Sequence, residues 1–186
     1  MDEWNFKRVG IEDQKLIEEY FRKYPERSCD RTFFGVLLWG RHYNLKFADT
    51  GKALLFREED ERGYGFAWPA GPEEEIRELI PQMEMYCEKH GGEFLMYGLS
   101  EAQFALLDSW YPGRYQIEYD RDAADYIYES EKLCTLSGKK LHGKRNHINK
   151  FKATYEDWAY EPLEEDNLEE CFQMALKWRN ENGCED

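Results

Sequence analysis

The sequence predicts an α/β or α+β domain built around one mixed sheet. Three observations lead to this prediction. Runs with alternating apolar residues are interspersed with segments of helical periodicity, three of these runs follow one another as in an antiparallel meander, and the 186 residues suffice for one buried core. With 41% hydrophobic and 34% charged residues, the composition is that of a folded globular protein.

The first half of the chain is expected to form two helices and then three strands. Residues 4–9 alternate as a short strand, and apolar side chains recur at helical spacing after Asp13, the expected cap. A second helix is expected to begin near Asp30 and to end near Gly40 or Asn44. The meander then comprises strands at 45–50, 52–58 and 63–68.

The second half of the domain is predicted to alternate helices and strands. Pro72 followed by three glutamates indicates a helix start, and Pro81 predicts a kink or break within that helix. Ser100 is a good cap for the next helix. The expected elements are, in order, a helix over 72–90, a strand over 93–99, a helix over 101–110 and a strand over 115–120.

Two segments of the chain are similar to each other. Residues 6–21 and 160–172 share an aromatic strand residue, an aliphatic residue, an acidic turn and an amphipathic helix. Coincidence is the alternative. The similarity predicts a first domain over 1–156 and the opening strand and helix of a second copy over 157–186. We expect this opening to pack on the first domain, on another chain or on the second half of a longer protein.

Basic residues are concentrated in one part of an acidic chain. The formal net charge is −14, yet residues 132–155 contain seven Lys and Arg and no Asp or Glu. The remaining 18 basic and 39 acidic residues leave a net charge of −21 elsewhere. Because most of the surface would repel phosphates, general coating of nucleic acid is excluded and an anionic ligand must be bound locally.

The basic residues are predicted to lie on a helix over 138–155 that Ser137 caps. Lys139 and Lys140 then fall in the first turn, where the helix dipole is already positive. An anion bound by these ammonium groups and the free backbone N–H groups would offset that charge, so we expect a phosphate or carboxylate site. The alternative is a solvated helix face with no ligand.

Other candidate sites are weaker. His142 and His147 are five residues apart, which is unsuitable for a metal pair on a helix. Residues 62–67 fit a loose acyl-CoA pyrophosphate pattern but are better interpreted as a strand. A solvated turn is the expected role of three clustered aspartates, Asp120, Asp122 and Asp125. No metal site and no catalytic base is predicted.

The composition also bears on the cellular compartment. No stretch approaches the roughly 18 apolar residues of a membrane-spanning helix, and residues 1–10 lack the apolar core of a signal peptide. The five cysteines are odd in number and contain no CxxC pair, so they are predicted to be reduced, structural thiols. We expect a cytoplasmic protein.

The sequence resembles the family named for the C-terminal domain of bacterial phosphatidylglycerol lysyltransferases. The resemblance rests on DYIY at 125–128, LCTLSGKKLHGKRNHINKF at 133–151 and YEPL at 160–163. It implies tandem GNAT-like domains, that is, a GNAT-like mixed sheet flanked by helices and the start of a second GNAT-like repeat. It also identifies the basic motif as a set of candidate binding residues, namely Lys139, Lys140, Lys144, Arg145, Asn146 and Asn149.

Two functions from different classes follow. The first is an acyl or aminoacyl transferase that binds the phosphates of an aminoacyl-tRNA, or less favourably of acyl-CoA, with its basic helix. The second is a non-catalytic module that binds a phosphorylated small molecule, nucleic acid or the anionic lipid head groups of a membrane surface, where it would be peripheral.

Overall fold

The computed structural model describes residues 4–60, 63–122, 124 and 126–183, and the chain divides into two compact units between residues 125 and 126. We call residues 1–125 the N-terminal unit and residues 126–186 the C-terminal unit. This division places the basic helix in the C-terminal unit, whereas the sequence analysis assigned it to a first domain ending at residue 156. The internal repeat itself stays a prediction.

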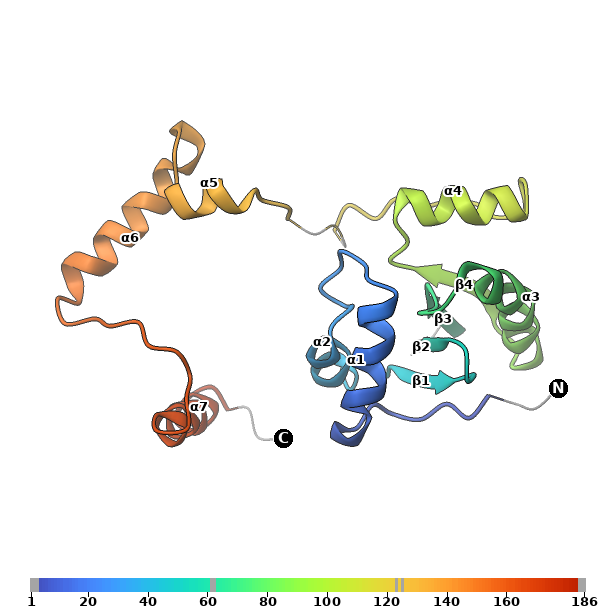
Figure 1. Cartoon of the computed structure of the whole chain (residues 1–186), viewed down its shortest axis with the longest axis horizontal. Helices are drawn as coiled ribbons and strands as arrows, with labels where there is room; N and C mark the ends of the chain where they lie inside the picture. Colours follow the sequence, from blue (N-terminus) through green and yellow to red (C-terminus); the bar gives the residue numbers. More distant parts are fainter. Residues whose placement is uncertain (1–3, 61–62, 123, 125, 184–186) are drawn as a thin grey trace. The chain divides into compact units, whose positions relative to one another are not determined.

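The N-terminal unit contains the predicted mixture of helices and strands (Figure 1). A 3-10 turn at Ile11–Asp13 precedes the first helix. The helices are α1 (Gln14–Lys23), α2 (Phe33–Trp39), α3 (Glu73–Lys89) and α4 (Glu101–Trp110). The strands are β1 (Lys46–Asp49), β2 (Leu54–Asp60), β3 (Gly63–Ala67) and β4 (Glu93–Tyr97).

The sheet is mixed, as predicted. Its order is β1-β2-β3-β4, with antiparallel pairing of β1 to β2 and of β2 to β3 and parallel pairing of β3 to β4. Helix α3 provides the crossover that parallel neighbours require. The strand expected over residues 4–9 is reduced to one antiparallel bridge between Lys7 and Phe47.

Helices cover both faces of the sheet, and alternate residues of each strand therefore belong to different apolar clusters. On β2, Leu54 and Phe56 pack with α1 and α2, whereas Leu55 packs with α3 and α4. Figure 1 shows α1 and α2 on one side of the strands and α3 on the other. This alternation of side chains along a strand builds two apolar clusters from one sheet.

Local signals set several helix boundaries in this unit. The Thr32 hydroxyl accepts a hydrogen bond from Gly35 N at 3.0 Å, and Ser100 forms a capping box with Gln103. Asp13 precedes α1 but does not cap it through its side chain, because its carboxylate is bound by Lys7. Helix α3 continues through Pro81, so the predicted break is wrong.

The strand predicted over residues 115–120 is absent. The chain there docks on α3 through side chains, since Arg114 Nη2 and Tyr115 Oη donate to the two oxygens of Glu84 at 2.6 and 2.8 Å. Ile117 and Tyr119 are both exposed. Alternation of apolar and polar residues predicted a strand, but side-chain contacts to Glu84 of α3 and to Phe94 of β4 hold the chain here in place of strand pairing.

The described part of the C-terminal unit is helical. It contains α5 (Ser130–Thr135), a 3-10 turn at Lys139–Leu141, α6 (His142–Thr154) and α7 (Leu168–Glu181). The helix expected after residue 160 is therefore present as α7, but the strand expected before it is not formed. None of the described residues of this unit is buried. No helix in the described parts of the chain combines the length and apolar character needed to cross a bilayer.

Candidate functional site

The basic segment, residues 132–155, turns sharply before its longest helix begins. Leu136, directly after α5, lies in the left-handed region with φ of 49°, and Gly138, two residues later, has φ of 87°. The predicted cap at Ser137 is wrong. Gly138 is the residue before the 3-10 turn and Leu141 is the residue before α6, and neither caps its helix through a side chain. The glycine allows a backbone turn that other residues would resist.

Arg145 closes this turn from within α6. Its Nη1 donates to the carbonyl of Leu136 and to the carbonyl of Gly138, the latter at 3.0 Å. The first of these acceptors directly follows α5 and the second directly precedes the 3-10 turn. A guanidinium in this position stabilises the connection between the two helices. Arg145, one of the predicted binding residues, therefore has a structural role.

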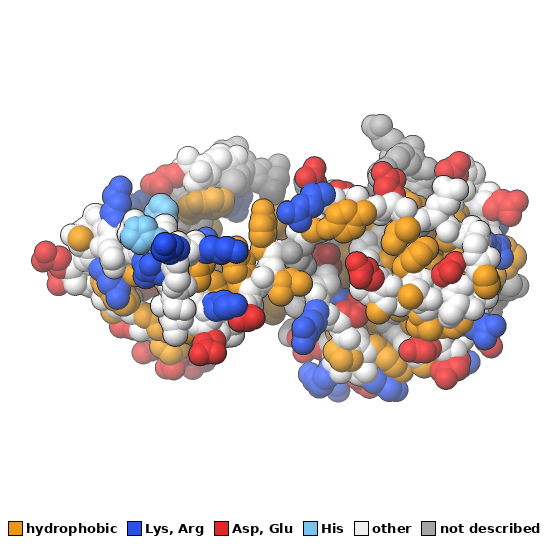
Figure 2. Space-filling view, turned by 90° about the horizontal axis from the view of Figure 1, so that it is seen from above, with side chains coloured by type: hydrophobic (Ala, Val, Ile, Leu, Met, Phe, Trp, Pro, Cys, Tyr) orange, Lys and Arg blue, Asp and Glu red, His pale blue; other side chains and the backbone are white. Residues whose placement is uncertain are grey.

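The lysines of the predicted site are exposed. Lys139, Lys140 and Lys144 are solvent-accessible, and within the described residues they take part in no ion pair. Asn149 is exposed, and Asn146 Nδ2 lies 3.2 Å from His142 Nε2. Figure 2 shows Lys and Arg side chains gathered around the histidines of this unit. The cationic groups that the sequence identified are thus available to an anion.

An acidic stretch follows the basic segment directly. Residues 156–170 contain eight Asp and Glu and no Lys or Arg. Two of these acids, Glu169 and Glu170, occupy the first turn of α7, where they interact favourably with the helix dipole. A polyanion is therefore attracted by one stretch of the C-terminal unit and repelled by the next, which restricts where it can bind.

The N-terminal unit has a cavity at the carboxyl ends of its parallel strands. Its volume is about 560 Å³, within the range of small-molecule sites. The aromatic side chains of Tyr24 and Trp68 and the carboxylates of Glu26 and Glu73 contribute to its wall. This combination suits a cationic group better than a phosphate. The remaining lining residues are Pro25, Pro69, Gly71, Pro72, Ile76, Ala102, Gln103 and Leu106.

A partly buried polar cluster adjoins Glu26 and Trp68. The side chain of Arg31 is only 7% exposed, and its Nη2 donates to Glu26 Oε1 at 2.8 Å and to the Trp68 carbonyl. Burial lowers the pKa of Arg31, and the neighbouring Glu26 opposes that shift. The guanidinium ties the segment after α1 to the end of β3. Sequence analysis missed it, because no local motif surrounds Arg31.

Tyr97, at the end of β4, is a second member of this cluster. Burial raises the pKa of Tyr97, and the nearby Glu58 carboxylate, to which it hydrogen-bonds, raises it further. The phenol therefore stays protonated and acts as a donor. A Cβ on Gly65 would lie 3.1 Å from Tyr97 Cδ1, so the glycine in β3 makes room for the ring. The sequence predicted only a buried strand here.

The acyl-CoA pattern at 62–67 is part of a strand. Residues 63–67 form β3, as the sequence analysis favoured, while Arg62 lies outside the described residues. The helix that follows begins with Glu73, Glu74 and Glu75. Because three glutamates lie in that first turn, of which only Glu75 is paired with a lysine (Lys52) among the described residues, a pyrophosphate would be repelled there.

The remaining sequence candidates do not form sites. Asp122 N donates to Asp120 Oδ1 at 2.9 Å within a turn, and Asp125 lies outside the described residues. Across the described residues, no three His, Cys, Asp or Glu side chains gather as a metal site would require. Cys87, on α3, is buried in the apolar core, and burial raises the pKa of its thiol to about 11.

Comparisons with known proteins place the chain in a family. A crystal structure of a conserved protein of unknown function from Bacteroides thetaiotaomicron is similar, with a TM-score of 0.80 and 31% identity, over 98% of this chain and 61% of that one. An uncharacterised protein of Mycoplasmoides gallisepticum is 37% identical over 79 residues, which are 41% of this chain and 25% of that protein. The chain thus spans only part of each relative.

The family match extends over both units. Residues 21–186 match the family described as phosphatidylglycerol lysyltransferase, C-terminal. This range includes α2, the whole sheet and the basic segment. The chain therefore belongs to the phosphatidylglycerol lysyltransferase C-terminal family, as the basic motif had indicated.

Proposed function

We propose that the chain is part of an aminoacyltransferase and that its basic segment binds the phosphates of an aminoacyl-tRNA donor. Membership of the family suggests a lysyltransferase-like role. The observation that carries the proposal is that Lys139, Lys140 and Lys144 are exposed and take part in no ion pair within the described residues, in a chain of net charge −14. A phosphate backbone releases counterions when it meets such a cluster, which favours binding.

Acyl-CoA is the less favoured donor. Its pyrophosphate needs free backbone N–H groups at a loop and helix start, without competing carboxylates. In the N-terminal unit the matching pattern is the strand β3, and the next helix begins with three glutamates. The basic segment has no such acidic neighbours from residue 132 to residue 155.

A GNAT-like fold for the N-terminal unit is part of this proposal. An antiparallel meander that passes through a crossover helix into a parallel strand supports it. The C-terminal unit would then open a second unit of the same kind, and the greater length of the solved relative, of which this chain spans 61%, supports that assignment. The repeat similarity of 6–21 and 160–172 points the same way.

The chemistry would be transfer of an aminoacyl group from an ester to an amine or hydroxyl. Such reactions depend mainly on holding the activated ester against the acceptor and on donors arranged around the developing oxyanion. The basic segment contributes binding energy and orientation. No catalytic base is assigned.

The decisive experiment is filter binding of aminoacylated tRNA across a range of salt concentrations. We expect affinity to fall with salt, and Lys139→Glu with Lys140→Glu to weaken binding by roughly tenfold or more and to reduce the salt slope by about two. The matched control is Lys15→Glu with Arg22→Glu on α1, which makes the same charge change at exposed positions. Salt-insensitive binding that the Lys139 and Lys140 variant leaves unchanged would remove tRNA as the donor.

A peripheral membrane module is the second candidate, and one observation favours it. Ile148 and Phe151, on the same helix as Lys144, are 43% and 48% exposed. Basic and apolar side chains on one helix are typical of interfacial binding. Flotation with vesicles of increasing anionic lipid content separates the candidates, because binding that follows lipid charge without tRNA binding would support the membrane module.

A further inference from the structure

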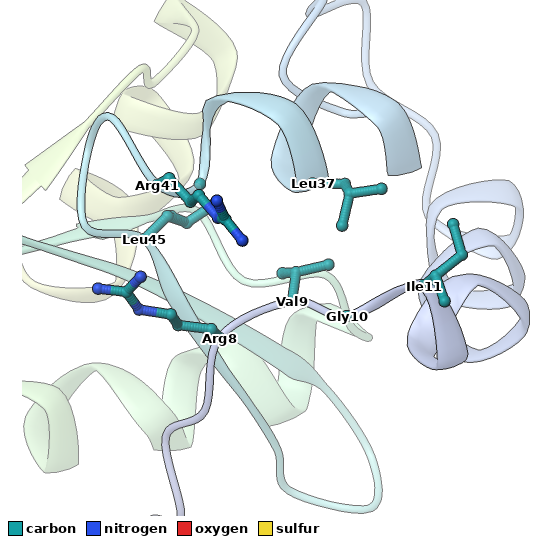
Figure 3. Close-up of a pocket in the computed structure, with 8 residues that line it drawn as sticks. Arg8, Val9, Gly10, Ile11, Leu37, Arg41 and Leu45 are labelled. Atoms are coloured by element: carbon teal, nitrogen blue, oxygen red, sulfur yellow. The ribbon is translucent and has the colours of Figure 1, made fainter. Parts of the chain in front are cut away.

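The N-terminal unit has a second cavity, away from the strand ends described above. Its volume is about 340 Å³, near the lower end of the range for small-molecule sites. The segment after the Lys7 bridge forms one wall and the end of α2 with the following turn forms the other (Figure 3). The lining residues are Arg8, Val9, Gly10, Ile11, Leu37, Gly40, Arg41 and Leu45.

Among the residues that the structure describes, two guanidinium groups at this cavity have no acidic partner. Arg8 and Arg41 are both exposed, and neither forms an ion pair or hydrogen bond within the described residues. Figure 3 shows Arg41 extending from the end of α2 over the cavity and Arg8 on the side of Leu45. Such unpaired guanidinium groups on two walls can converge on one carboxylate or phosphate.

The nearest buried carboxylate is already neutralised. Asp13 is 6% exposed, with Lys7 Nζ 2.6 Å from Oδ1 and Gly10 N donating to Oδ2 at 3.0 Å. The carboxylate of Glu12 lies over Gly10, where a Cβ would otherwise stand. Counting Arg8, Arg41 and Glu12, the groups at the cavity have a net charge of +1 in a strongly acidic chain.

The rest of the wall is apolar. Leu45 is buried, Val9 and Leu37 are half-buried, and Figure 3 shows Leu37 and Val9 facing each other across the cavity. An apolar body placed between them would remove both side chains from water, which favours binding. The cavity therefore combines an anion-binding end with an apolar end.

We propose that this cavity binds a small monoanionic carboxylate with a short, branched apolar body. The carboxylate contacts Arg8 and Arg41, and the body packs against Val9, Leu37 and Leu45. A single negative charge matches the net charge of +1, whereas a dianionic phosphate would also be repelled by Glu12. This site is independent of the basic segment and of the proposed tRNA binding.

The test is an NMR titration of the whole chain with 4-methylpentanoate as the probe. We expect changes in amide chemical shift to be confined to residues 8–12 and 36–46. The affinity for 4-methylpentanoate should be at least about tenfold higher than the affinity for 4-methylpentan-1-ol, which lacks the charge, and for acetate, which lacks the apolar body. 4-Methylpentyl phosphate should bind less tightly than the carboxylate.

Variants locate the two ends of the site. Arg8→Gln with Arg41→Gln should weaken carboxylate binding roughly tenfold, whereas Arg22→Gln with Arg27→Gln, which removes the same charge elsewhere, should not. Leu37→Ser should weaken the binding of 4-methylpentanoate but not the binding of acetate. Lys139→Glu with Lys140→Glu should leave carboxylate binding unchanged. Equal binding of the alcohol and the carboxylate, or equal loss in both arginine pairs, would overturn the proposal.

Discussion

The two units of this chain contain similar amphipathic helices but differ in what covers them. In the N-terminal unit, α3 has five buried residues, among them Ile80 and Met83 at 0% exposure, because the sheet lies against its apolar stripe. In the C-terminal unit, α6 and α7 have none, and Phe151, Phe172 and Trp178 are 48%, 56% and 58% exposed.

This difference shows that helical periodicity predicts which face of a helix is apolar, but not what that face packs against. Most helical stability in proteins comes from packing of the apolar face, since short isolated helices are marginal in water. The N-terminal unit has its own sheet to pack on. The C-terminal unit has no strand among its described residues, so its helices depend on other surfaces for burial.

The strongest test of this comparison is removal of one phenyl ring from each unit. Phe66→Ala in β3, fully buried, should lower the free energy of unfolding by about 3–5 kcal/mol through loss of packing and creation of a cavity. Phe151→Ala in α6 should lower it by less than about 1 kcal/mol. Urea unfolding monitored by circular dichroism gives both values. A similar loss for Phe151→Ala would show that its face is covered in solution.

A smaller effect is expected for the turn that Arg145 closes. Arg145→Met keeps much of the side-chain volume but removes the donors to Leu136 and Gly138, which should cost about 1 kcal/mol of local stability. Hydrogen exchange of the amides in α5 and early α6 should become roughly fivefold faster. Lys15→Met, at an exposed position of α1 outside the basic segment, is the control. Unchanged exchange with weaker tRNA binding would instead make Arg145 a direct phosphate ligand.

The smallest effect at neutral pH concerns Tyr97. Its pKa in the folded state is raised above the ordinary value of 10.0, so the stability that the buried neutral phenol provides is complete below pH 10 and is lost as the pH rises further. Tyr97→Phe should reduce this alkaline loss. Urea unfolding between about pH 8 and about pH 11 measures it. The reverse slope, with stability rising above pH 10, would mean that the phenolate is the favoured form.

Most elements of the N-terminal unit could be predicted because their signals are local. Apolar periodicity identified α1 and α2, and the three glutamates after Pro72 and the cap at Ser100 marked the starts of α3 and α4. Apolar runs bounded by turn signals gave the four strands of the sheet. The family could also be predicted, because the basic motif is a continuous stretch of sequence.

The failures occur where another contact or a backbone turn competes with a local preference. Residues 115–120 alternate like a strand, but Tyr115 binds Glu84 on α3 instead. Asp13 has the chemistry of a cap, but Lys7 binds its carboxylate first. Ser137 fails as a cap because the backbone turns at Leu136. Each local preference is worth about 1 kcal/mol, which such contacts outweigh.

The sequence by itself determined the order of the elements, the faces that are apolar and the place of the unpaired positive charge, because these depend on spacing and composition along one chain. Only the tertiary structure decided that Arg31 would reach the Trp68 carbonyl and that Arg8 and Arg41 would share a cavity. Those pairs lie more than 30 residues apart, and folding, not local preference, brings them together.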